Sequence, residues 1–289
     1  MIRGYIHIMV GAAFWGISAT IAKFLFNNSI DPLIIVQTRV SFAFVVLFLV
    51  LLTLNRPALK IEWSCSYKFA LLGILGIAGP NVTYYYAIKL TSVATAILLQ
   101  YTVTVMVMLY GILILKESNT WYKWMALILS LAGCYFAVGG LESAAFHTNK
   151  VGLILGLLSA VTFAFLNIYG KVLSSLYTRW SIMVFSFGFA SLFWLLVNPP
   201  WKILAQNYSF QQWLIFIGFS MISILIPYIF YFLGLKYLQA SRVIIISTLE
   251  PIVAILSAFL ILGELMSPFQ ILGGVMVIGA IILLQTHQE

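Results

Sequence analysis

The sequence carries little charge for its length. Only 8% of its 289 residues are Asp, Glu, Lys or Arg, whereas soluble domains carry about 25%. Hydrophobic residues account for 63%, which is more than the interior of a water-soluble fold of this size can hold. A lipid bilayer supplies the missing apolar surroundings. We therefore expect an integral membrane protein whose main structural partner is the lipid bilayer.

Motifs for catalysis, cofactors and metals are also missing. Cys65 and Cys134 form no CxxC pair, and we expect both to be free thiols. His7, His147 and His287 are dispersed, and none belongs to an HExxH motif. There is no GxSxG nucleophile elbow and no Walker motif, so ATP hydrolysis in this chain cannot drive transport. We expect no enzyme, no catalytic residue, no cofactor and no metal site.

Ten apolar runs are long enough to cross a bilayer, since a spanning helix needs about 20 residues at 1.5 Å rise each. Breakers mark several boundaries: Asp31-Pro32 opens the second run, Asn198-Pro199-Pro200 closes the seventh and Ser267-Pro268 opens the tenth. The pattern predicts an all-α membrane protein. Its ten transmembrane helices are expected near residues 5–26, 32–53, 67–88, 92–115, 121–140, 151–172, 180–198, 211–235, 240–262 and 268–285.

The net charge of +8 does not indicate a nucleic-acid partner, because the basic residues are scattered between apolar runs and form no patch or stripe. Positive charge in a membrane protein sets its topology and contacts anionic lipid headgroups. With the N-terminus inside, the inner segments carry ten Lys or Arg and the outer segments four, with Arg39 left inside a span. Both termini are therefore predicted to be cytoplasmic.

The two halves of the chain match at a nearly constant offset. A shift of 147 aligns Pro80 with Pro227, Tyr84 with Tyr231, Lys89 with Lys236 and Glu117 with Glu264, and a shift of 148 aligns Lys23 with Lys171. We predict two five-helix repeats, residues 1–145 and 146–289. Because five is odd, the second repeat is inverted, as in many secondary transporters with a site near the midplane. The alternative is a duplicated scaffold that transports nothing.

Motifs near the ends of both halves resemble one family. The first half has Leu98-Leu99-Gln100-Tyr101-Thr102 followed by Leu115-Lys116-Glu117, and the second has Leu249-Glu250-Pro251 followed by Leu262-Gly263-Glu264. Gly11-Ala12-Ala13-Phe14-Trp15-Gly16 in the first span and Arg39 in the second extend the likeness. Over nearly the whole chain, the sequence resembles the EamA family of the drug/metabolite transporter superfamily.

The resemblance implies a transporter of small metabolites, since family members carry amino acids, amines, nucleosides and other metabolites. It favours an amino acid or an amine as the substrate here. The sequence departs from the family at Thr104, where the first-half pattern usually has proline. This departure predicts a straighter fourth helix, because proline is the usual cause of a kink, and unequal flexing of the two halves.

Glu250 is the only acidic residue deep in a predicted span. It lies about ten residues into the ninth span, near the midplane, where a charge costs about 2.5–3.5 kcal/mol on insertion scales. It should therefore face a cavity or a partner. It is either a cation-binding or proton-coupling carboxylate, or a carboxyl that bonds a neighbouring helix. Pro251 beside it removes a helical donor and can free a backbone carbonyl.

Other polar and aromatic side chains mark a candidate binding region. Arg39 either binds a substrate carboxylate or reaches the interface and ties helix ends together. Pro80-Asn81 and Pro227-Tyr228 are matched mid-span breaks, which indicate either a binding region or packing kinks. Tyr84 and Tyr231 follow these prolines by one helical turn, and their rings either close over a planar or cationic ligand or pack against neighbours.

The remaining candidates place amides, hydroxyls or aromatic rings inside spans, where they either line a pocket or bond helix to helix. They are Trp15, Gln37, Gln100, Tyr101, Asn167, Tyr169, Ser247 and Thr248. Glu117 and Glu264 are interpreted as structural partners of nearby basic residues, and Lys171 and Lys236 as interface anchors. The predicted substrate-binding set is Glu250, Tyr84, Tyr231, Asn81, Gln100, Trp15, Arg39, Asn167 and Ser247, with Glu250 as the coupling residue.

The sequence supports the hypothesis of a secondary active transporter that exports a small metabolite, an amino acid or an amine, by alternating access. Glu250 would meet an ammonium group or exchange a proton, which makes protons a candidate partner beside the small-molecule substrate. A compact chain with short loops suits a bacterial inner membrane, that is, the plasma membrane. The alternatives are an uncoupled facilitator or channel for small solutes, and a non-transporting membrane scaffold.

Overall fold

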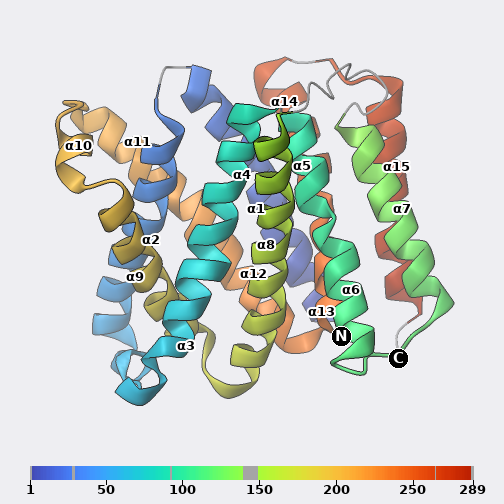
Figure 1. Cartoon of the computed structure of the whole chain (residues 1–289), viewed down its shortest axis with the longest axis horizontal. Coiled ribbons are helices and arrows are strands. Elements are labelled where there is room, and N and C mark those ends of the chain that lie inside the picture. Colours follow the sequence, from blue (N-terminus) through green and yellow to red (C-terminus); the bar gives the residue numbers. More distant parts are fainter. Residues whose placement is uncertain (1, 28–29, 92, 139–148, 264, 288–289) are drawn as a thin grey trace.

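The computed structural model describes residues 2–27, 30–91, 93–138, 149–263 and 265–287. Within these ranges the chain is built from helices and contains no strand. Figure 1 shows the long helices running side by side between two faces of one bundle. The first and last helices both have their outer ends at the same face (Figure 1), which we call the termini face. The predicted all-α fold is confirmed for the described residues.

The first half begins with two long helices and continues in shorter segments. They are α1 (Ile2–Asn27), α2 (Pro32–Leu54), the short 3-10 helices η1 (Arg56–Leu59) and η2 (Trp63–Cys65), α3 (Ser66–Leu71), the π-helix η3 (Leu72–Ala78), α4 (Gly79–Leu90), α5 (Val93–Tyr101), α6 (Val103–Leu113) and α7 (Trp121–Ala137). The predicted boundary between the repeats, at 145/146, lies outside the described residues.

The second half follows a similar order. It comprises α8 (Lys150–Leu176), α9 (Arg179–Val197), the short α10 (Pro200–Leu204), α11 (Phe210–Ser220), the π-helix η4 (Met221–Leu225), α12 (Ile226–Tyr237), α13 (Ala240–Ser247), α14 (Leu249–Leu262) and α15 (Pro268–Thr286).

Eight helical runs in the described part of the chain are long and apolar enough to cross a membrane. Each corresponds to one predicted span, with bounds that agree within a few residues. The two predicted spans without a counterpart among the eight are the third and the fifth. The third corresponds to the run from α3 through α4, and the fifth to α7, whose 17 residues fall short of the usual span of about 20.

The predicted breakers act as helix caps. Asp31 accepts a hydrogen bond from the Leu33 backbone N–H at 2.8 Å, which satisfies a free donor at the start of α2. Ser267 and Gln270 form a capping box at the start of α15, with Pro268 in its first turn. These caps explain why the helices begin where the sequence predicts.

Matching π-helical turns precede Pro80 and Pro227. The π-helix η3 joins α3 to α4, and η4 joins α11 to α12, and in each case the proline stands in the first turn of the following helix. Proline has no N–H, and its ring clashes with the carbonyl four residues back in a regular α-helix. A wider turn before the proline accommodates it.

The fourth and ninth predicted spans are interrupted at Thr102 and Thr248. Each threonine hydroxyl donates to the carbonyl three residues back at 2.6 Å, and the two residues have similar backbone angles (φ −60°, ψ −14° and φ −65°, ψ −6°). The prediction that Thr104 straightens the fourth helix is wrong. Hydroxyls that bond nearby carbonyls compete with the helical ladder, and Thr104 adds another such bond, to Tyr101 at 2.8 Å.

Helix contacts link the two halves throughout the bundle. The first helix, α1, packs against α12 and α14 of the second half, and α8 packs against α4, α5 and α6 of the first half. The helices α2 and α9 pack together, as do α7 and α15. Every long helix therefore has a partner from the other half, and the centre of the bundle is shared between them.

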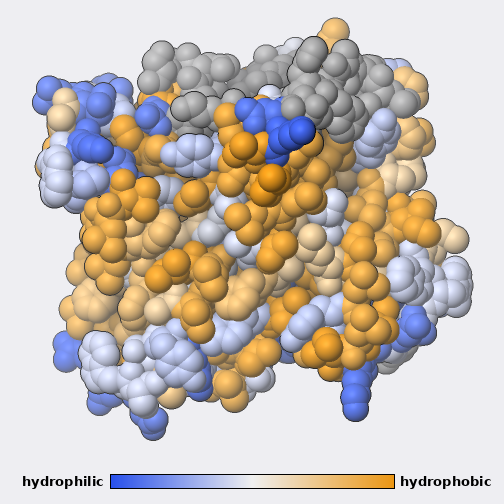
Figure 2. All heavy atoms as spheres, viewed as in Figure 1, coloured by the Kyte–Doolittle hydropathy of each residue, from blue (hydrophilic) through white to orange (hydrophobic). Residues whose placement is uncertain are grey.

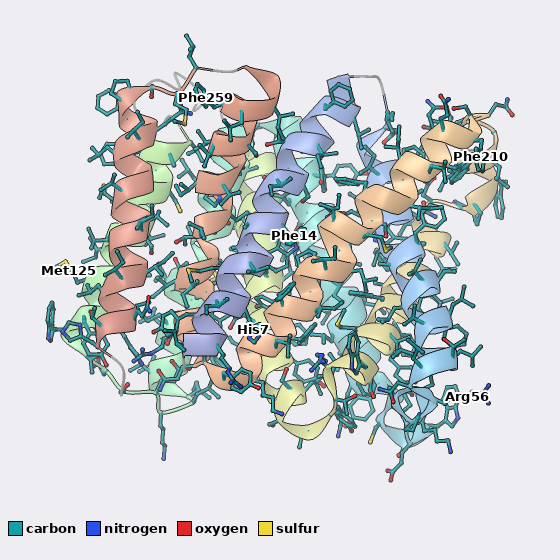
Figure 3. All side chains as sticks on the ribbon, turned by 180° about the vertical axis from the view of Figure 1, so that it is seen from behind. His7, Phe14, Arg56, Met125, Phe210 and Phe259 are labelled. Atoms are coloured by element: carbon teal, nitrogen blue, oxygen red, sulfur yellow. The ribbon has the colours of Figure 1, made fainter. Side chains whose placement is uncertain are left out.

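Much of the outer surface is apolar. Figure 2 shows hydrophobic residues across the middle of one face and hydrophilic residues towards its upper and lower edges. Leu196 is 84% exposed and Leu260 is 70% exposed, which would be unfavourable in water but fits contact with lipid. Figure 3 places Arg56 at the lower edge of the bundle, towards which Figure 1 marks both termini.

The crossing of α7 and α15 gives a stability prediction. A Cβ on Gly273 would meet the Gly133 carbonyl oxygen and the Ala137 backbone, whereas a Cβ on Gly279, in the same helix, would meet nothing within 4 Å. We expect Gly273→Ala to cost about 1–3 kcal/mol through overpacking and to lower the melting temperature in detergent by several degrees. The matched control Gly279→Ala should leave it unchanged or raise it, since alanine favours helix. Equal melting temperatures would contradict the close crossing.

Candidate functional site

A cavity of about 130 Å³ lies inside the bundle, between the two halves. For scale, an apolar cavity of about 150 Å³ holds one benzene molecule. The cavity is lined by Trp15, Ser18, Ala19 and Ala22 of α1, Arg39 of α2, Pro80, Asn81, Tyr84 and Tyr85 of α4, Gln100 of α5, Phe163 and Leu166 of α8, Ser223 and Ile224 of η4, Tyr228 of α12, and Glu250 of α14. Six of the nine predicted site residues are on its wall.

The cavity lies in the half of the bundle away from the termini face. Helix α1 starts at that face (Figure 1), and the cavity residues Trp15 to Ala22 come from its second half. At 1.5 Å per residue, Ala22 lies about 30 Å along the helix. Ala19 is exposed within this wall. The cavity therefore reaches from mid-depth towards the opposite face.

Glu250 stands on the cavity wall in the first turn of α14, directly after the break at Thr248. The Tyr101 hydroxyl faces the Glu250 carboxyl and also donates to the Ser247 carbonyl at 3.4 Å. A Cβ on Gly16 would meet the Glu250 backbone carbonyl, so this glycine allows α1 to approach α14 closely. The structure thus turns the only deep acidic residue among those described towards a cavity rather than towards lipid.

Arg39 also lines the cavity. The sequence alone left two alternatives for Arg39, a binding role and a position at the membrane interface. The Arg39 guanidinium donates to the Asn81 side-chain oxygen and lies 5.9 Å from the centre of the Tyr85 ring. Asn81 is held in turn by a bond from its amide nitrogen to the Ile77 carbonyl at 2.6 Å. Arg39 Nε is buried without a hydrogen-bond partner in the described residues. The guanidinium is therefore oriented by α4 but retains a free donor.

Aromatic rings close the cavity towards the termini face. The Trp15 ring lies 5.3 Å from Tyr231, 5.5 Å from Tyr228 and 6.5 Å from Phe163, measured between ring centroids. These residues come from α1, α12 and α8, so both halves contribute. The rings of Trp15, Phe163 and Tyr228 line the cavity and form a packed aromatic layer, and Tyr231 packs against this layer without lining the cavity.

Three predicted site residues do not line this cavity. Tyr231 and Asn167 are fully buried beyond the aromatic layer, and Ser247 donates to the Val243 carbonyl of its own helix at 2.9 Å. Two further candidates have packing roles. Gln37 exchanges hydrogen bonds with Asn198 at the end of α9, both at 2.8 Å, and the Tyr169 ring stacks on Phe165.

Several small or apolar lining residues were not among the sequence predictions. Ser18, Ala19 and Ala22 share one face of α1 with Trp15, since residues three and four apart lie on the same side of a helix. Helical spacing from Trp15 could have found them. Ser223 and Ile224 have no such signal, because they enter the wall only through the π-helical turn of η4.

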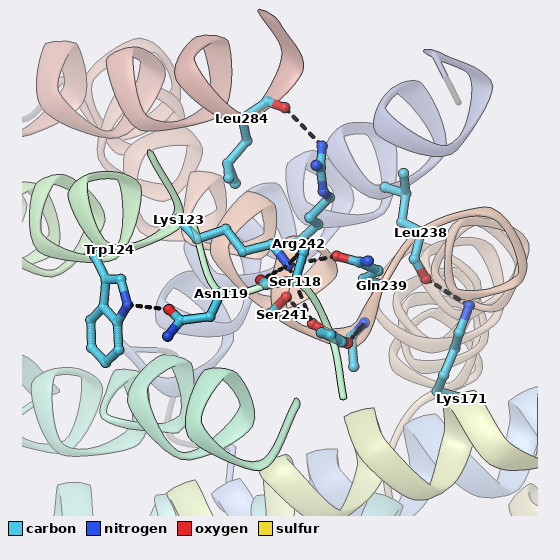
Figure 4. A network of polar contacts seen from close by, with 12 residues as sticks. Ser118, Asn119, Lys123, Trp124, Lys171, Leu238, Gln239, Ser241, Arg242 and Leu284 are labelled. Carbon is cyan, nitrogen blue, oxygen red and sulfur yellow. Dashed lines mark hydrogen bonds and ion pairs between the residues drawn. The ribbon is translucent and has the colours of Figure 1, made fainter. Parts of the chain in front are cut away.

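A second polar network joins side chains from several helices (Figure 4). Lys123 at the start of α7 is fully buried. Its ammonium donates to the Ser118 carbonyl at 2.8 Å and to Gln239 Oε1 at 2.7 Å, and lies 3.9 Å from the Glu117 carboxylate. Glu117 also accepts from the Ala240 backbone N–H at 3.0 Å. The network therefore joins the α6–α7 loop to the start of α13.

This network confirms the interpretation of Glu117 as a structural partner of a basic residue, whereas its counterpart Glu264 lies outside the described residues. Lys171 is not a simple interface anchor, because it donates to the Leu235 and Leu238 carbonyls at 2.5 and 2.6 Å (Figure 4). It satisfies acceptors at the end of α12. Arg242 is also buried there and donates to the Leu284 carbonyl at 2.9 Å.

The arrangement can bind a small polar molecule, and the described residues contain no group of three or more side chains that could hold a metal ion. A carboxyl and a guanidinium share one cavity with two amides and several aromatic rings. A few polar groups within a mostly apolar concave wall are typical of small-molecule sites.

A model of the EamA-like transporter family matches residues 2–139 and 150–286 of this chain. The chain is 26% identical over 265 residues to an uncharacterized transporter of Archaeoglobus fulgidus, covering 91% of this chain and 90% of that protein. It is 24% identical over 297 residues to an uncharacterized transporter of Clostridium kluyveri, covering 100% and 95%. A Salmonella typhimurium protein named uncharacterized inner membrane transporter YicL is 21% identical, with 98% and 95% covered.

A solved crystal structure of a protein has a similar fold, with a TM-score of 0.78 over 96% of this chain and 95% of that one. The sequence identity between the two is 15%, so this likeness concerns the fold alone.

The network around Glu117 gives a second stability prediction. Glu117→Ala removes the carboxylate beside buried Lys123 and the acceptor of the Ala240 N–H, and we expect a loss of about 3 kcal/mol, seen as a lower melting temperature in detergent. Adding Lys123→Met should restore part of that loss, because the buried charge is gone. The control Glu62→Ala alters an exposed acid and should change little. Equal effects of Glu117→Ala and Glu62→Ala would contradict the network.

Proposed function

The chain belongs to the EamA-like transporter family and is a multi-pass membrane protein, and we propose that it is a secondary active transporter that exports a small metabolite by alternating access. We propose an amino acid or an amine as the substrate and the plasma membrane as the location of the protein. The observation that carries the proposal is one cavity between the two halves that holds Glu250 and Arg39 together.

The proposed architecture is ten transmembrane helices in two inverted repeats, residues 1–145 and 146–289. Matching interruptions at Thr102 and Thr248 support it, as do the π-helical turns η3 and η4. Close contacts also correspond. A Cβ on Gly4 would meet residues 237 and 238, and a Cβ on Gly152 would meet residues 90 and 91. Gly4 corresponds to Gly152 at a shift of 148, and residues 90 and 91 correspond to residues 237 and 238 at a shift of 147.

Both termini are proposed to be cytoplasmic. The bias of Lys and Arg towards the predicted inner segments supports this orientation, and so does the position of Arg56 at the lower edge of the bundle, towards which both termini lie (Figure 1 and Figure 3). In this orientation the cavity reaches towards the outside of the cell. Loading from the cytoplasm then requires a second conformation, which is what two inverted halves of similar energy provide.

The charged groups suit a molecule that carries an ammonium, with or without a carboxylate. Glu250 supplies an anion, and Arg39 supplies a cation with one donor free of protein partners in the described residues. The rings of Trp15, Tyr84 and Tyr228 can pack against apolar parts of the ligand or its cationic group. A volume of about 130 Å³ restricts the ligand to a small molecule.

Glu250 is proposed as the coupling residue. A carboxylate removed from water favours its protonated form unless a cation or hydrogen bonds stabilise the charge. A bound ammonium and a proton are therefore alternatives at this carboxyl. Exchange of one for the other links substrate movement to proton movement, and the break at Thr248 lets α14 reorient without moving α13.

Uptake into proteoliposomes tests the coupling role. We expect saturable flux of a labelled amino acid or amine that a pH gradient accelerates, and we expect Glu250→Gln to abolish the response to the gradient, because an amide cannot exchange a proton. Glu62→Gln, which removes an exposed charge far from the cavity, is the control and should behave as the wild type. Unchanged pH dependence in Glu250→Gln would overturn the coupling role.

Arg39 distinguishes the two substrate classes. Arg39→Gln should raise the KM for amino acids at least tenfold, because their carboxylate loses its cation, while the KM for amines without a carboxylate changes little. Arg56→Gln removes an exposed arginine outside the cavity and is the control. An equal rise for amines and amino acids would assign Arg39 a packing role instead.

The same assay separates a carrier from the alternatives. A carrier saturates and its flux is stimulated by substrate on the opposite side, whereas a channel or facilitator shows neither coupling nor such stimulation. No flux with any amino acid or amine would remove the proposed substrate class and favour other metabolites or a scaffold.

A further inference from the structure

We propose that a second polar chamber lies on the termini side of the aromatic layer, built around Asn167 and Tyr231, and that it opens when the present cavity closes. This inference rests on the proposed alternating-access function and names the residues that meet the substrate in the opposite-facing state. The chamber offers neutral hydrogen-bonding groups only, so it would contact the polar but uncharged parts of a small ligand.

The first observation is a group of buried polar atoms without partners. Both amide atoms of Asn167, the hydroxyl of Tyr231 and the hydroxyl of Ser186 are buried and make no hydrogen bond with the part of the chain that the structure describes. All three residues have 0% exposure. The Asn167 side chain and the Tyr231 hydroxyl lie close enough to interact, but they do not reach the distance and angles of a regular hydrogen bond.

Buried polar groups are nearly always hydrogen-bonded in native proteins, because an unmade bond costs the full desolvation of the group. The unpaired atoms of Asn167, Tyr231 and Ser186 therefore call for an explanation, and a functional role is one of the recognised ones. If the region opens to water or ligand in another conformation, the same atoms gain partners there. The desolvation cost of the unpaired atoms raises the free energy of the present conformation. This lowers the barrier to leaving that conformation.

The second observation is the relation of these residues to the present cavity. A shift of 147 takes Tyr84 to Tyr231 and Arg39 to Ser186, and a shift of 148 takes Ala19 to Asn167. Tyr84, Arg39 and Ala19 all line the open cavity. The orphaned polar atoms thus occupy the positions that correspond to the cavity wall in the other half.

Backbone contacts show that this correspondence is structural as well as sequential. Ser220 donates to the Arg39 carbonyl at 2.5 Å. The shift of 147 takes Gly73 to Ser220 and Arg39 to Ser186, and Gly73 lies directly against the Ser186 carbonyl. Corresponding helices therefore meet at corresponding residues in these two contacts, each of which joins one half to the other.

The two walls differ in charge. The counterpart of Arg39 is Ser186, and that of Glu250 under the shift of 147 is Val103. The second chamber consequently has an amide, a phenol and a hydroxyl, but none of the charged groups of the first. The charged ends of the ligand stay with Glu250 and Arg39, while Asn167 and Tyr231 contact the part that turns towards the termini side.

Cysteine accessibility tests the chamber. In a background with Cys65→Ser and Cys134→Ala, single substitutions Asn167→Cys, Ser186→Cys and Ala19→Cys are exposed to methanethiosulfonate ethyltrimethylammonium, a charged and membrane-impermeant reagent. Ala160→Cys, on the same helix as Asn167 and also fully buried, is the control. Inside-out and right-side-out vesicles present each face of the membrane in turn, with a C-terminal tag marking the termini side.

We expect Ala19→Cys to react from the side opposite the termini, and Asn167→Cys and Ser186→Cys to react from the termini side at least tenfold faster than Ala160→Cys. Ser186→Cys is nearly isosteric and guards against misfolding at Asn167. The proposal of a second chamber would be overturned if Asn167→Cys and Ser186→Cys react no faster than Ala160→Cys while Ala19→Cys reacts fully.

Flux through the cysteine-free background keeps the two proposals separate. Flux together with unreactive Asn167→Cys and Ser186→Cys refutes the chamber and leaves the transport proposal standing. Reactive cysteines without flux of any amino acid or amine support the chamber and refute the proposed substrate class.

Discussion

The bilayer cannot hydrogen-bond an open backbone, and this constraint governs where the helices of this protein are interrupted. Irregular backbone at membrane depth is tolerated only where protein or a polar cavity surrounds it. Thr248 is fully buried, and η3 and η4 each contribute buried residues to the interior. The interruptions bring Gln100, Ser223 and Glu250 to one cavity. Helix interruptions from both halves therefore contribute residues to the same cavity.

Hydropathy predicted the helical fold well, because burial in lipid requires long apolar runs that are visible in the sequence. Glu250 and Arg39 could be predicted as cavity residues for the related reason that a charge inside a span needs a polar surrounding. The lining alanines and Ser223 could not, since small side chains enter the wall through helix position and backbone geometry alone.

Thr104 shows a different limit of sequence reasoning. The fourth span has Thr104 where the family pattern usually has proline, and this departure predicted a straighter fourth helix. The structure has a similar break in the fourth and ninth spans, and at each break a threonine hydroxyl donates to the carbonyl three residues back. Similarly, Asn167 and Tyr231 carry polar signals like those of the cavity residues. Only the packing of the aromatic layer separates the two sets.

The crossing of α7 and α15 has a consequence for how such a chain can evolve. Gly133 and Gly273 lie backbone against backbone, so no side chain at either position can rotate aside to admit a larger residue. A substitution at one glycine cannot be compensated at the other, which is already the smallest residue. A larger residue at either position could be accommodated only if the two helices moved apart.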